Sequence, residues 1–533
     1  MLLKWIEIVV VAACCAVGAR HYIHMLQLES YQLPGYKRYL NRNFERIMRS
    51  TVLIGVIFTI LDYVMPALLI PMTGGIPEHR GTIATIIVMV LFAAACALLM
   101  LKAKHTPAKK PLVMTKRAKR LYGALCVLML ISCTIISFVT LPPYLVYAVV
   151  AYLVLAAEFI EEPVEKAINA GFYKSAQQKL NERDDLIKIG ITGSYGKTST
   201  KFALRDILSV KFNVLATPSS FNTPMGVSSI VNNELKRSHQ VFIAEMGARH
   251  VGDIKELVEL VHPKYALLTS IGPQHMDTFG SINNIVNTKN EIMEGLPEDG
   301  VGFFASDGEF CDRLYVKCER EKYRTAYDAN RKPHMLIGEV QVDNEGSRFT
   351  LTCSDGTSAR CRTKLLGRHN IQNIALAASA ARRLGMTMEE IARGIRRIEP
   401  VEHRLQLISG PITVIDDAFN SNPSGSAEAL NVLSGFTSGR RIIVTPGMVE
   451  QGEKEDDVNY AFGAQMRGKV DYAILVGPKH TAPIRSGMVE SGFSEEHIIT
   501  VTDLTEATAE LHRLGRPGDV VLFENDLPDN YNE

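Results

Sequence analysis

A glycine-rich segment between a short apolar strand and a helix constrains this chain most. Residues 187–191 are predicted to form a short apolar strand, and residues 193–199 read Gly-Ser-Tyr-Gly-Lys-Thr-Ser. Apolar residues then follow at helical spacing, at 202, 204, 207 and 208. Such a strand, loop and helix bind phosphate, because the glycines let backbone N–H groups point inward and the helix N-terminus attracts anions. The alternative is an ordinary glycine-rich turn.

The side chains of this loop suit a nucleotide. Lys197 supplies a positive charge, and Thr198 or Ser199 can hold Mg²⁺ through a hydroxyl. Ile191 stands where the strict eight-residue pattern has its first glycine, so the motif is a variant. The loop therefore predicts an ATP-type site formed by Gly193, Ser194, Tyr195, Gly196, Lys197, Thr198 and Ser199.

The composition divides the chain, whose 533 residues are enough for about three domains. Residues 1–160 are mostly apolar, whereas residues 161–533 have the composition of a soluble α/β protein. The net charge of +1 offers no bulk attraction to nucleic acid, so no such partner is expected. The nine cysteines include no CxxC pair, which disfavours a zinc site or a disulfide framework and fits a reducing compartment.

Five apolar segments occur in the first part of the chain, at roughly 3–19, 52–73, 82–101, 122–141 and 144–160. Most approach the ~20 residues that a membrane-spanning helix needs. The first is short and carries Glu7, so a four-span alternative places it on the membrane surface. Asp62 falls near the middle of the second segment, where a charge is costly. Three roles are open for it: packing as a hydrogen-bonded carboxyl, binding a lipid head group, or pairing with another helix.

Basic residues predict the orientation of these segments. The 20–50 and 102–120 loops are rich in Lys and Arg, whereas residues 74–81 and the turn at 141–144 carry little charge. Basic loops stay on the cytoplasmic side. The chain is therefore predicted to be a multi-pass protein of the plasma membrane, in contact with the lipid bilayer. Residues 161 onward are then cytoplasmic, where ATP is available.

Beyond a polar, helical connector at 161–185, strands alternate with helices. The first strands expected after the glycine-rich loop are at 241–244, 265–270 and 301–304. Glu245, His275 and Asp307 follow the ends of these strands. Ligands bind beyond the carboxyl ends of the strands in an open parallel sheet, so these three residues are expected near Lys197.

The rest of the chain is predicted to hold more α/β structure. Residues 339–365 resemble a small β-rich insertion, and helices are expected at about 369–384 and from Thr387, whose Glu390 completes a capping box. Later strands are expected at about 412–416, 441–445, 472–476 and 520–523. No GxGxxG motif follows the first of them, so a nicotinamide cofactor is not implied.

The predicted architecture is multi-domain. It comprises an α-helical membrane domain at 1–160, the connector at 161–185, a P-loop ATPase-like α/β domain at 186–400 and a Rossmann-like α/β domain at 401–533.

Eight ordered blocks of sequence resemble the Mur ligase family, and its dipeptide-adding branch in particular. They lie at 192–199, 220–226, 244–248, 275–280, 288–291, 367–373, 403–405 and 416–423. The resemblance covers about 186–525. It implies an ATP-dependent amide ligase of peptidoglycan or cell-envelope synthesis, in which a carboxylate attacks the γ-phosphate of ATP and the resulting acyl phosphate reacts with an amine.

The resemblance also implies roles for individual residues. Lys197 would contact the β- and γ-phosphates, and Thr198 with Glu245 would hold a first Mg²⁺. His275 and a carbamoylated Lys289 would serve a second Mg²⁺. Each residue has a simpler alternative when it is considered without the other sequence blocks. His275 would then be an ordinary loop histidine, and Lys289 would be a solvated lysine on a helix.

Further residues are implied for the nucleotide and the substrates. Asn370 and Asn373 would border the adenine, and Asp307, Arg404 and Asp417 would complete the ATP site, with Arg404 also catalytic. The substrate residues would be Asn222, Thr223, Asn420 and Asn422. The last two have a simpler alternative as a turn before Pro423.

Two departures leave the substrates open. The family normally begins with a soluble domain that binds a UDP-sugar precursor, whereas this chain begins with apolar segments, which favours a lipid-linked carboxylate substrate. The family's Lys-Gly-Ser block is missing from residues 523–531, so the amine is either an amino acid or a dipeptide. A polyglutamate-type synthase has the same ligase core. A nucleotide-driven transporter or assembly factor is the other alternative, and it predicts paired polar or broken membrane helices.

Overall fold

The computed structural model describes residues 2–29, 31–69, 77–105, 111–139, 141–219, 221–306, 308–343, 346–401, 403–418, 423–449 and 454–525. Contacts divide the chain into two units, Met1–Ala170 and Gly171–Glu533.

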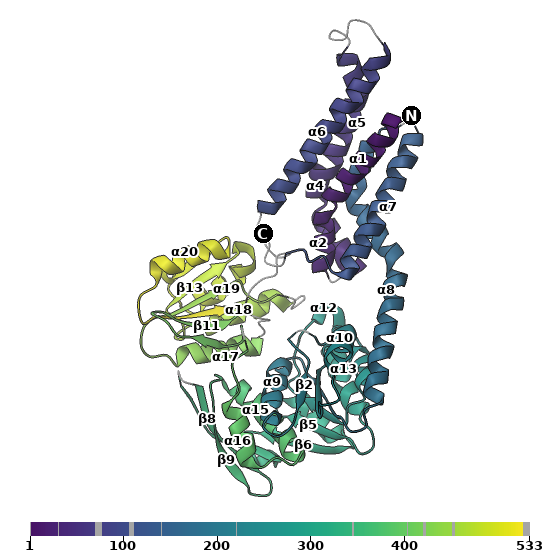
Figure 1. Cartoon of the computed structure of the whole chain (residues 1–533). Helices are drawn as coiled ribbons and strands as arrows, with labels where there is room; N and C mark the ends of the chain where they lie inside the picture. Colours follow the sequence, from purple (N-terminus) through teal and green to yellow (C-terminus); the bar gives the residue numbers. More distant parts are fainter. Residues whose placement is uncertain are drawn as a thin grey trace. The chain divides into compact units, whose positions relative to one another are not determined.

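The first unit is helical (Figure 1). Its helices are α1 (Leu2–Gly18), α2 (Arg20–Leu28), α3 (Leu33–Arg42), α4 (Phe44–Ile47), η1 (Met48–Val52), α5 (Leu53–Leu68), α6 (Pro77–His105), α7 (Lys116–Phe138), η2 (Pro143–Val149) and α8 (Val150–Asn181). Five stretches are long and apolar enough to cross a membrane: Leu2–Leu28, Phe44–Leu68, Gly81–Leu101, Lys116–Phe138 and Pro143–Asn181. The first reaches this length because α2 continues α1 almost without a break. The last apolar segment and most of the predicted connector form a single helix, α8.

Aromatic and aliphatic side chains fill the interior of this unit. The Phe92 ring lies 5.2 Å from that of Tyr144 and 5.5 Å from that of Tyr147, both edge to face. Asp62 of α5 is half-buried, and its role stays a prediction.

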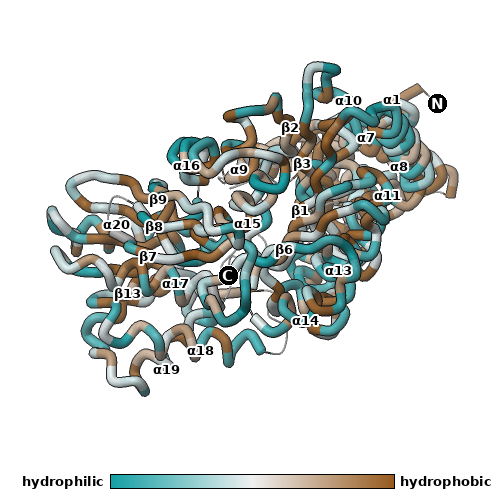
Figure 2. The backbone as a smooth tube through the Cα atoms, turned by 90° about the horizontal axis from the view of Figure 1, so that it is seen from below, coloured by the Kyte–Doolittle hydropathy of each residue, from teal (hydrophilic) through white to brown (hydrophobic). Residues whose placement is uncertain are grey.

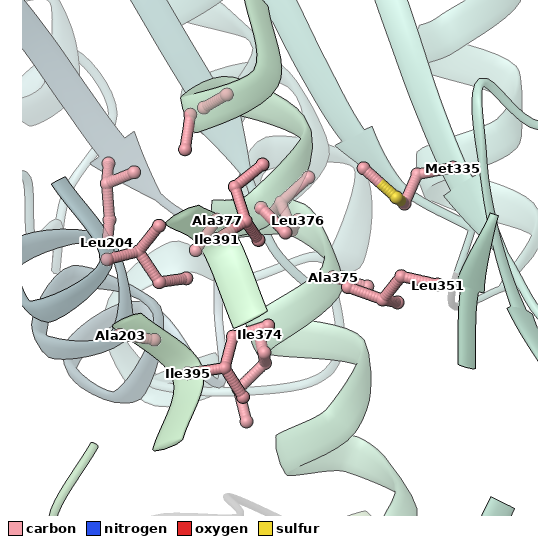
Figure 3. Close-up of a cluster of buried hydrophobic side chains, with 14 of the residues drawn as sticks. Ala203, Leu204, Met335, Leu351, Ile374, Ala375, Leu376, Ala377, Ile391 and Ile395 are labelled. Carbon is pink, nitrogen blue, oxygen red and sulfur yellow. The ribbon is translucent and has the colours of Figure 1, made fainter. Parts of the chain in front are cut away.

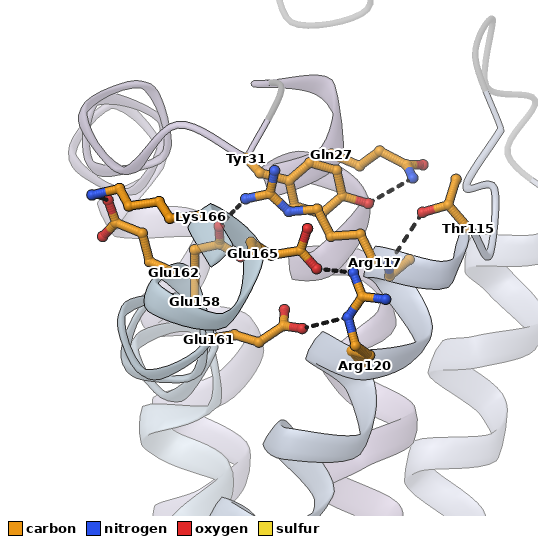
Figure 4. Close-up of polar contacts among 11 residues, drawn as sticks. Gln27, Tyr31, Thr115, Arg117, Arg120, Glu158, Glu161, Glu162, Glu165 and Lys166 are labelled. Atoms are coloured by element: carbon orange, nitrogen blue, oxygen red, sulfur yellow. Dashed lines mark hydrogen bonds and ion pairs between the residues drawn. The ribbon is translucent and has the colours of Figure 1, made fainter. Parts of the chain in front are cut away.

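Buried ion pairs join α7 to α8 (Figure 4). Arg117 pairs with Glu158, and Arg120 pairs with Glu165 and, at 3.1 Å, with Glu161. The three glutamates are buried. Removing one partner of a buried pair leaves an uncompensated charge, so these pairs hold the two helices in register.

A nine-stranded sheet forms the centre of the second unit, in the order β2-β3-β1-β4-β5-β6-β7-β8-β9. The strands are β1 (Ile187–Thr192), β2 (Val214–Ala216), β3 (Val241–Glu245), β4 (Tyr265–Leu268), β5 (Val301–Ala305), β6 (Glu321–Ala326), β7 (Met335–Asp343), β8 (Gly346–Cys353) and β9 (Ser358–Thr363). Pairing is parallel as far as β7 and antiparallel from β7 to β9.

Two expectations for this sheet were wrong. Residues 339–365 are β-rich, as predicted, but they are not an insertion, because β7 continues the parallel sheet and β8 and β9 extend it. The strand expected at 265–270 ends at Leu268, because the chain then turns and Ser270 forms a single bridge with Tyr195 of the glycine-rich loop.

Helices cover the central sheet. They are α9 (Lys197–Leu208), α10 (Pro224–Glu234), α11 (Asp253–Val261), α12 (Met276–Phe279), α13 (Ile282–Glu294), α14 (Glu309–Lys317), α15 (Arg368–Arg383) and α16 (Met388–Arg396). The alanine-rich α15 packs closely against α9 and α16, with Ala375 and Ala377 in one apolar cluster with Leu204 (Figure 3). Figure 2 shows hydrophobic segments along β1 and β3. The predicted capping box of Thr387 and Glu390 is confirmed at the start of α16.

A second sheet has the order β10-β11-β15-β12-β13-β14, with only β10 antiparallel. Its strands are β10 (Gln406–Ile408), β11 (Thr413–Asp417), β12 (Arg441–Thr445), β13 (Tyr472–Val476), β14 (Ile498–Val501) and β15 (Val520–Glu524). The helices α17 (Pro423–Ser434), α18 (Glu455–Gln465), α19 (Pro478–Glu490) and α20 (Leu504–Leu514) connect them. The predicted fold class, a helical region followed by two α/β regions, is confirmed.

Candidate functional site

The glycine-rich loop leaves β1 at the point where the strand order changes direction. The chain passes from β1 to β2 on one side of the sheet, and β4 and β5 lie on the other side. Ile191 is in register with Glu245 of β3, and Thr192 with Leu268 of β4. The loop, Glu245 and the segment after β4 therefore meet at the carboxyl edge, which is the usual ligand-binding position in such a sheet.

Close contacts explain both glycines of the loop. Gly193 and Gly196 have φ values of 149° and 81°. A Cβ on Gly193 would lie 1.9 Å from Oγ1 of Thr269, and one on Gly196 would lie 2.5 Å from Oδ1 of Asn373. Only glycine fits either position. Asn373, predicted near the adenine, thus lies directly against the loop.

The side chains of Ser194 and Tyr195 fasten the loop to the segment after β4. The Ser194 hydroxyl donates to the Gly272 carbonyl at 3.0 Å, and the Tyr195 hydroxyl donates to the Pro273 carbonyl at 2.6 Å. The backbone N–H of Ser194 also donates, to the Ser270 carbonyl at 2.7 Å, so of these two residues Tyr195 is the one expected to offer its N–H to a phosphate.

Lys197 begins α9 and is folded back over the loop. Its Nζ donates to the carbonyls of Gly193 at 2.7 Å and Ser194 at 2.9 Å. Burial lowers the pKa of Lys197 to about 8, an effect that the charge of Glu245 opposes and that of Arg404 reinforces. An anion beside the ammonium group would favour its charged form.

Glu245 collects three donors around one buried carboxylate. Its Oε1 accepts from the Thr198 hydroxyl and from Nδ2 of Asn222, both at 3.1 Å. Its Oε2 accepts from Nζ of Lys201 at 2.8 Å. Burial acts to raise the pKa of Glu245, but Lys201 and Lys197 together bring it below the ordinary value, so the carboxylate stays ionised.

This carboxylate and the Thr198 hydroxyl fit Mg²⁺, which prefers oxygen ligands and takes one or two carboxylates together with phosphates and water. No group of three or more His, Cys, Asp or Glu residues suitable for a metal occurs in the described parts of the chain. A cation held by Glu245 and Thr198 would take its remaining ligands from phosphate and water.

Lys201 is a site residue that the sequence interpretation missed. It lies one helical turn after Lys197, is fully buried and forms an ion pair with Glu245. Its Nζ also donates to the Pro218 carbonyl at 2.9 Å. In the sequence it looks like an ordinary helix lysine, and its only signal is its place on the face of α9 that carries Lys197.

We expect Lys201→Met to lower the free energy of unfolding by about 3 kcal/mol, because it leaves Glu245 buried without its cation. The pKa of Glu245 should rise, so the pH below which activity is lost should move upward. Denaturant unfolding and a pH–rate profile measure the two effects. Lys201→Arg keeps the charge and should restore most of the stability and most of the activity at low pH. An unchanged acid limb of the pH–rate profile in Lys201→Met would contradict the role of Lys201 beside Glu245.

Lys289 and His275 occupy different settings. Lys289 of α13 is 2% exposed, and burial, followed by the charge of Lys197, holds its pKa well below the ordinary lysine value. It is therefore not the solvated helix lysine of the simpler alternative. His275 precedes α12 in a left-handed conformation, with φ of 54°. Its role as a metal ligand stays a prediction.

Other predicted residues surround the loop. Ser199, Asn370 and Arg404 line one small pocket of about 10 Å³, room for about one water molecule. The Thr223 hydroxyl accepts from the N–H of Gly226 at 3.2 Å and so caps α10. Asp307, Asn420 and Asn422 lie outside the described residues.

Arg404 stands between two residues in left-handed backbone conformations, His403 with φ of 60° and Leu405 with φ of 45°. Both flanks are tied to β11. Nδ1 of His403 lies 2.7 Å from Oδ2 of Asp416, and the N–H of Leu405 donates to Oδ1 of Asp417 at 3.0 Å. Burial raises the pKa of Asp417 to about 6, although the Leu405 N–H and the Arg404 charge oppose the change.

Known proteins resemble this part of the chain. Residues 191–381 match the family described as Mur ligase middle domain, and residues 403–524 match the one described as Mur ligase, glutamate ligase domain. The UDP-N-acetylmuramoyl-tripeptide--D-alanyl-D-alanine ligase of Bacillus subtilis is 29% identical over 342 residues, or 63% of this chain and 72% of the relative. Its namesake in Mycobacterium tuberculosis strain H37Rv is 31% identical over 358 residues, or 63% and 69%.

Solved structures share the fold. MurF from Acinetobacter baumannii has a TM-score of 0.61 at 24% identity, over 67% of this chain and 77% of that one. The MurF ligase of Thermotoga maritima in complex with ADP has a TM-score of 0.60 at 22% identity, over 67% and 80%. The residues before 191 lie outside both family matches.

Proposed function

Because this chain belongs to the Mur ligase family, we propose that it is a membrane-anchored peptide ligase of the D-alanyl-D-alanine-adding type. The family consists of ATP-dependent ligases that need Mg²⁺ and form peptide bonds, so the chain is an enzyme. Relatives are named for a UDP-N-acetylmuramoyl-tripeptide and D-alanyl-D-alanine. A carboxylate and the amine of a dipeptide or amino acid are therefore the proposed substrates.

The observation that best supports this proposal is the contact between Thr198 and Glu245 beside Lys197. A hydroxyl, a carboxylate and an ammonium group from two neighbouring strand ends converge where the loop can hold a triphosphate. Mg²⁺ held by Thr198 and Glu245 would neutralise phosphate charge. Phosphoryl transfer needs positioning and charge stabilisation rather than a protein nucleophile.

The chain's own residues divide this work in the proposed mechanism. Backbone N–H groups of the loop and Nζ of Lys197 hold the phosphates while the substrate carboxylate attacks the γ-phosphorus and ADP leaves. Arg404 adds a second positive charge near Lys197 and Glu245. The amine then attacks the acyl carbonyl carbon, phosphate leaves with the electron pair of the broken C–O bond, and the nitrogen loses a proton to the departing phosphate or to water. Lys201 positions Glu245 throughout.

The apolar helices support a lipid-linked carboxylate substrate. Five stretches suit a membrane, and they precede the region that matches the family. An enzyme held in the bilayer meets a lipid-linked donor at high effective concentration. We therefore place the active domains on the cytoplasmic face of the plasma membrane and the donor in the same leaflet.

We expect kcat/KM to be higher for a lipid-linked peptide donor than for its soluble UDP-linked counterpart, because only the first is concentrated in the bilayer. The measurement is ADP and product formation by the full chain in nanodiscs, with D-alanyl-D-alanine and a panel of D- and L-amino acids as amines. Preference for the UDP-linked tripeptide would identify an anchored form of the ordinary enzyme. Successive additions of glutamate would instead identify a polyglutamate synthase.

A further inference from the structure

An apolar groove lies between α3 and α8 in the first unit, and none of its lining residues belongs to the nucleotide site. Its volume is about 340 Å³, within the ~300–1,000 Å³ typical of ligand pockets. It is lined by Leu33, Lys37, Tyr152, Leu155, Ala156, Phe159 and Ile160. No carboxylate is among these residues.

Helical spacing explains why these side chains share one groove. The five residues from α8 recur at intervals of three and four and so form a stripe, about 12 Å long at 1.5 Å per residue. Leu33 and Lys37 are four residues apart on α3. Helix α3 is fixed beside α8 because the Tyr36 hydroxyl donates to the Ala151 carbonyl at 3.0 Å. The groove is thus a built feature of two anchored helices.

The groove exposes much apolar surface. Tyr152, Phe159 and Ile160 are 43%, 68% and 57% exposed, although the opposite stripe of α8, with Val154 and Glu158, is buried. In the proposed membrane setting, exposed apolar surface of this kind contacts the acyl chains of lipids. Ile160 is the last residue of α8 that lines the groove.

The positive charge of Lys37 in the lining of the groove selects among possible occupants. Lys37, Arg38 and Arg42 of α3 are exposed, and within the described chain they form no ion pair. A second copy docked here would bring these positive charges together at a cost in energy. A phosphate group instead complements them, and Lys and Arg near a membrane surface each contribute about 1 kcal/mol of attraction to anionic lipids.

From this juxtaposition we propose that the groove binds an anionic phospholipid, with one acyl chain along the α8 stripe and the phosphate at Lys37. The inference rests on the proposed membrane setting but not on the ligase reaction. It makes the protein dependent on the charge of the surrounding bilayer.

The test measures lipid retention by the full chain. Protein from nanodiscs that hold equal amounts of phosphatidylglycerol and phosphatidylcholine is extracted into detergent, and retained lipids are counted by native mass spectrometry. We expect a preference for phosphatidylglycerol of about fivefold or more, the factor that corresponds to one cation near the lipid phosphate. Lys37→Glu should abolish the preference, and Ala156→Trp, which fills the groove, should lower retention of both lipids.

Lys119→Glu is the matched control. Lys119 is exposed and does not line the groove, and its substitution changes the charge by the same amount. It should keep the preference, and an equal loss in Lys119→Glu and Lys37→Glu would overturn the proposal. Equal retention of both lipids by the unaltered chain, or a dimer that Ala156→Trp dissociates, would overturn it as well. The readout needs no ligation, so failure of the proposed function would leave this result intact.

Discussion

Replacing Lys197 with alanine is expected to lower the ligation rate by roughly 10²–10³-fold, the scale for removing one preorganised donor from a transition state. Nζ of Lys197 is held at the loop by the carbonyls of Gly193 and Ser194, so its charge is in place before charge develops on the transferred phosphoryl group. The measurement is Mg²⁺-dependent release of ADP coupled to formation of the amide product.

Lys255→Ala is the control for Lys197→Ala, because it removes a lysine from the exposed side of α11. It should leave the rate unchanged. Thermal unfolding should be compared for both variants, so that a loss of fold is not read as a loss of catalysis. The expected loss is far larger than twofold. If Lys197→Ala retains more than about half of the activity, given that scale, the loop takes no part in the reaction.

Replacing Lys289 with alanine should have an effect of similar size, about 10²-fold or more. Burial and the charge of Lys197 hold the pKa of Lys289 well below the ordinary lysine value, which favours the neutral amine, and a neutral amine nitrogen can attack carbon dioxide. A C–N bond forms, a proton leaves, and the product is a carbamate with one negative charge. The repulsion between Lys289 and Lys197 then becomes attraction.

Two measurements distinguish a carbamate from a structural lysine at this position. Bicarbonate labelled with ¹³C should give a carbamate signal in the unaltered chain and none in Lys289→Ala. Acetate or formate should partly restore the activity of the alanine variant by supplying the missing carboxylate. A fully active alanine variant, or an absent signal with no rescue, would leave Lys289 as a packing residue.

Strong local signals explain what could be predicted from the sequence. The family was identified correctly because its glycine-rich loop, Glu245 and the other blocks keep a fixed order along the chain. Strands such as β1, β3 and β5 are short buried apolar runs, which are easily recognised. The strands β2, β10 and β14 were missed because they have three or four residues and are partly exposed.

What the sequence could not give depends on contacts between distant segments. Lys201 is 44 residues from Glu245, so the ion pair between them exists only once β3 lies beside β1. Likewise, the hydrogen bonds of the Ser194 and Tyr195 side chains could not be predicted, because their partners, Gly272 and Pro273, lie 78 residues further along the chain. Residues 339–365 were read as an insertion because pairing of β7 with β6 has no local signature.

The backbone around Arg404 would link the catalytic role proposed for this residue to the folding of the second sheet. His403 and Leu405 hold conformations that cost of the order of 1–3 kcal/mol each in residues of their kind, so the linker would relax if left alone. Contacts with Asp416 and Asp417 of β11 maintain it. The place of the guanidinium is therefore a property of the folded second sheet rather than of the local sequence. In a chain whose second sheet is only partly formed, the Arg404 guanidinium would no longer be held in this position, even with the glycine-rich loop intact.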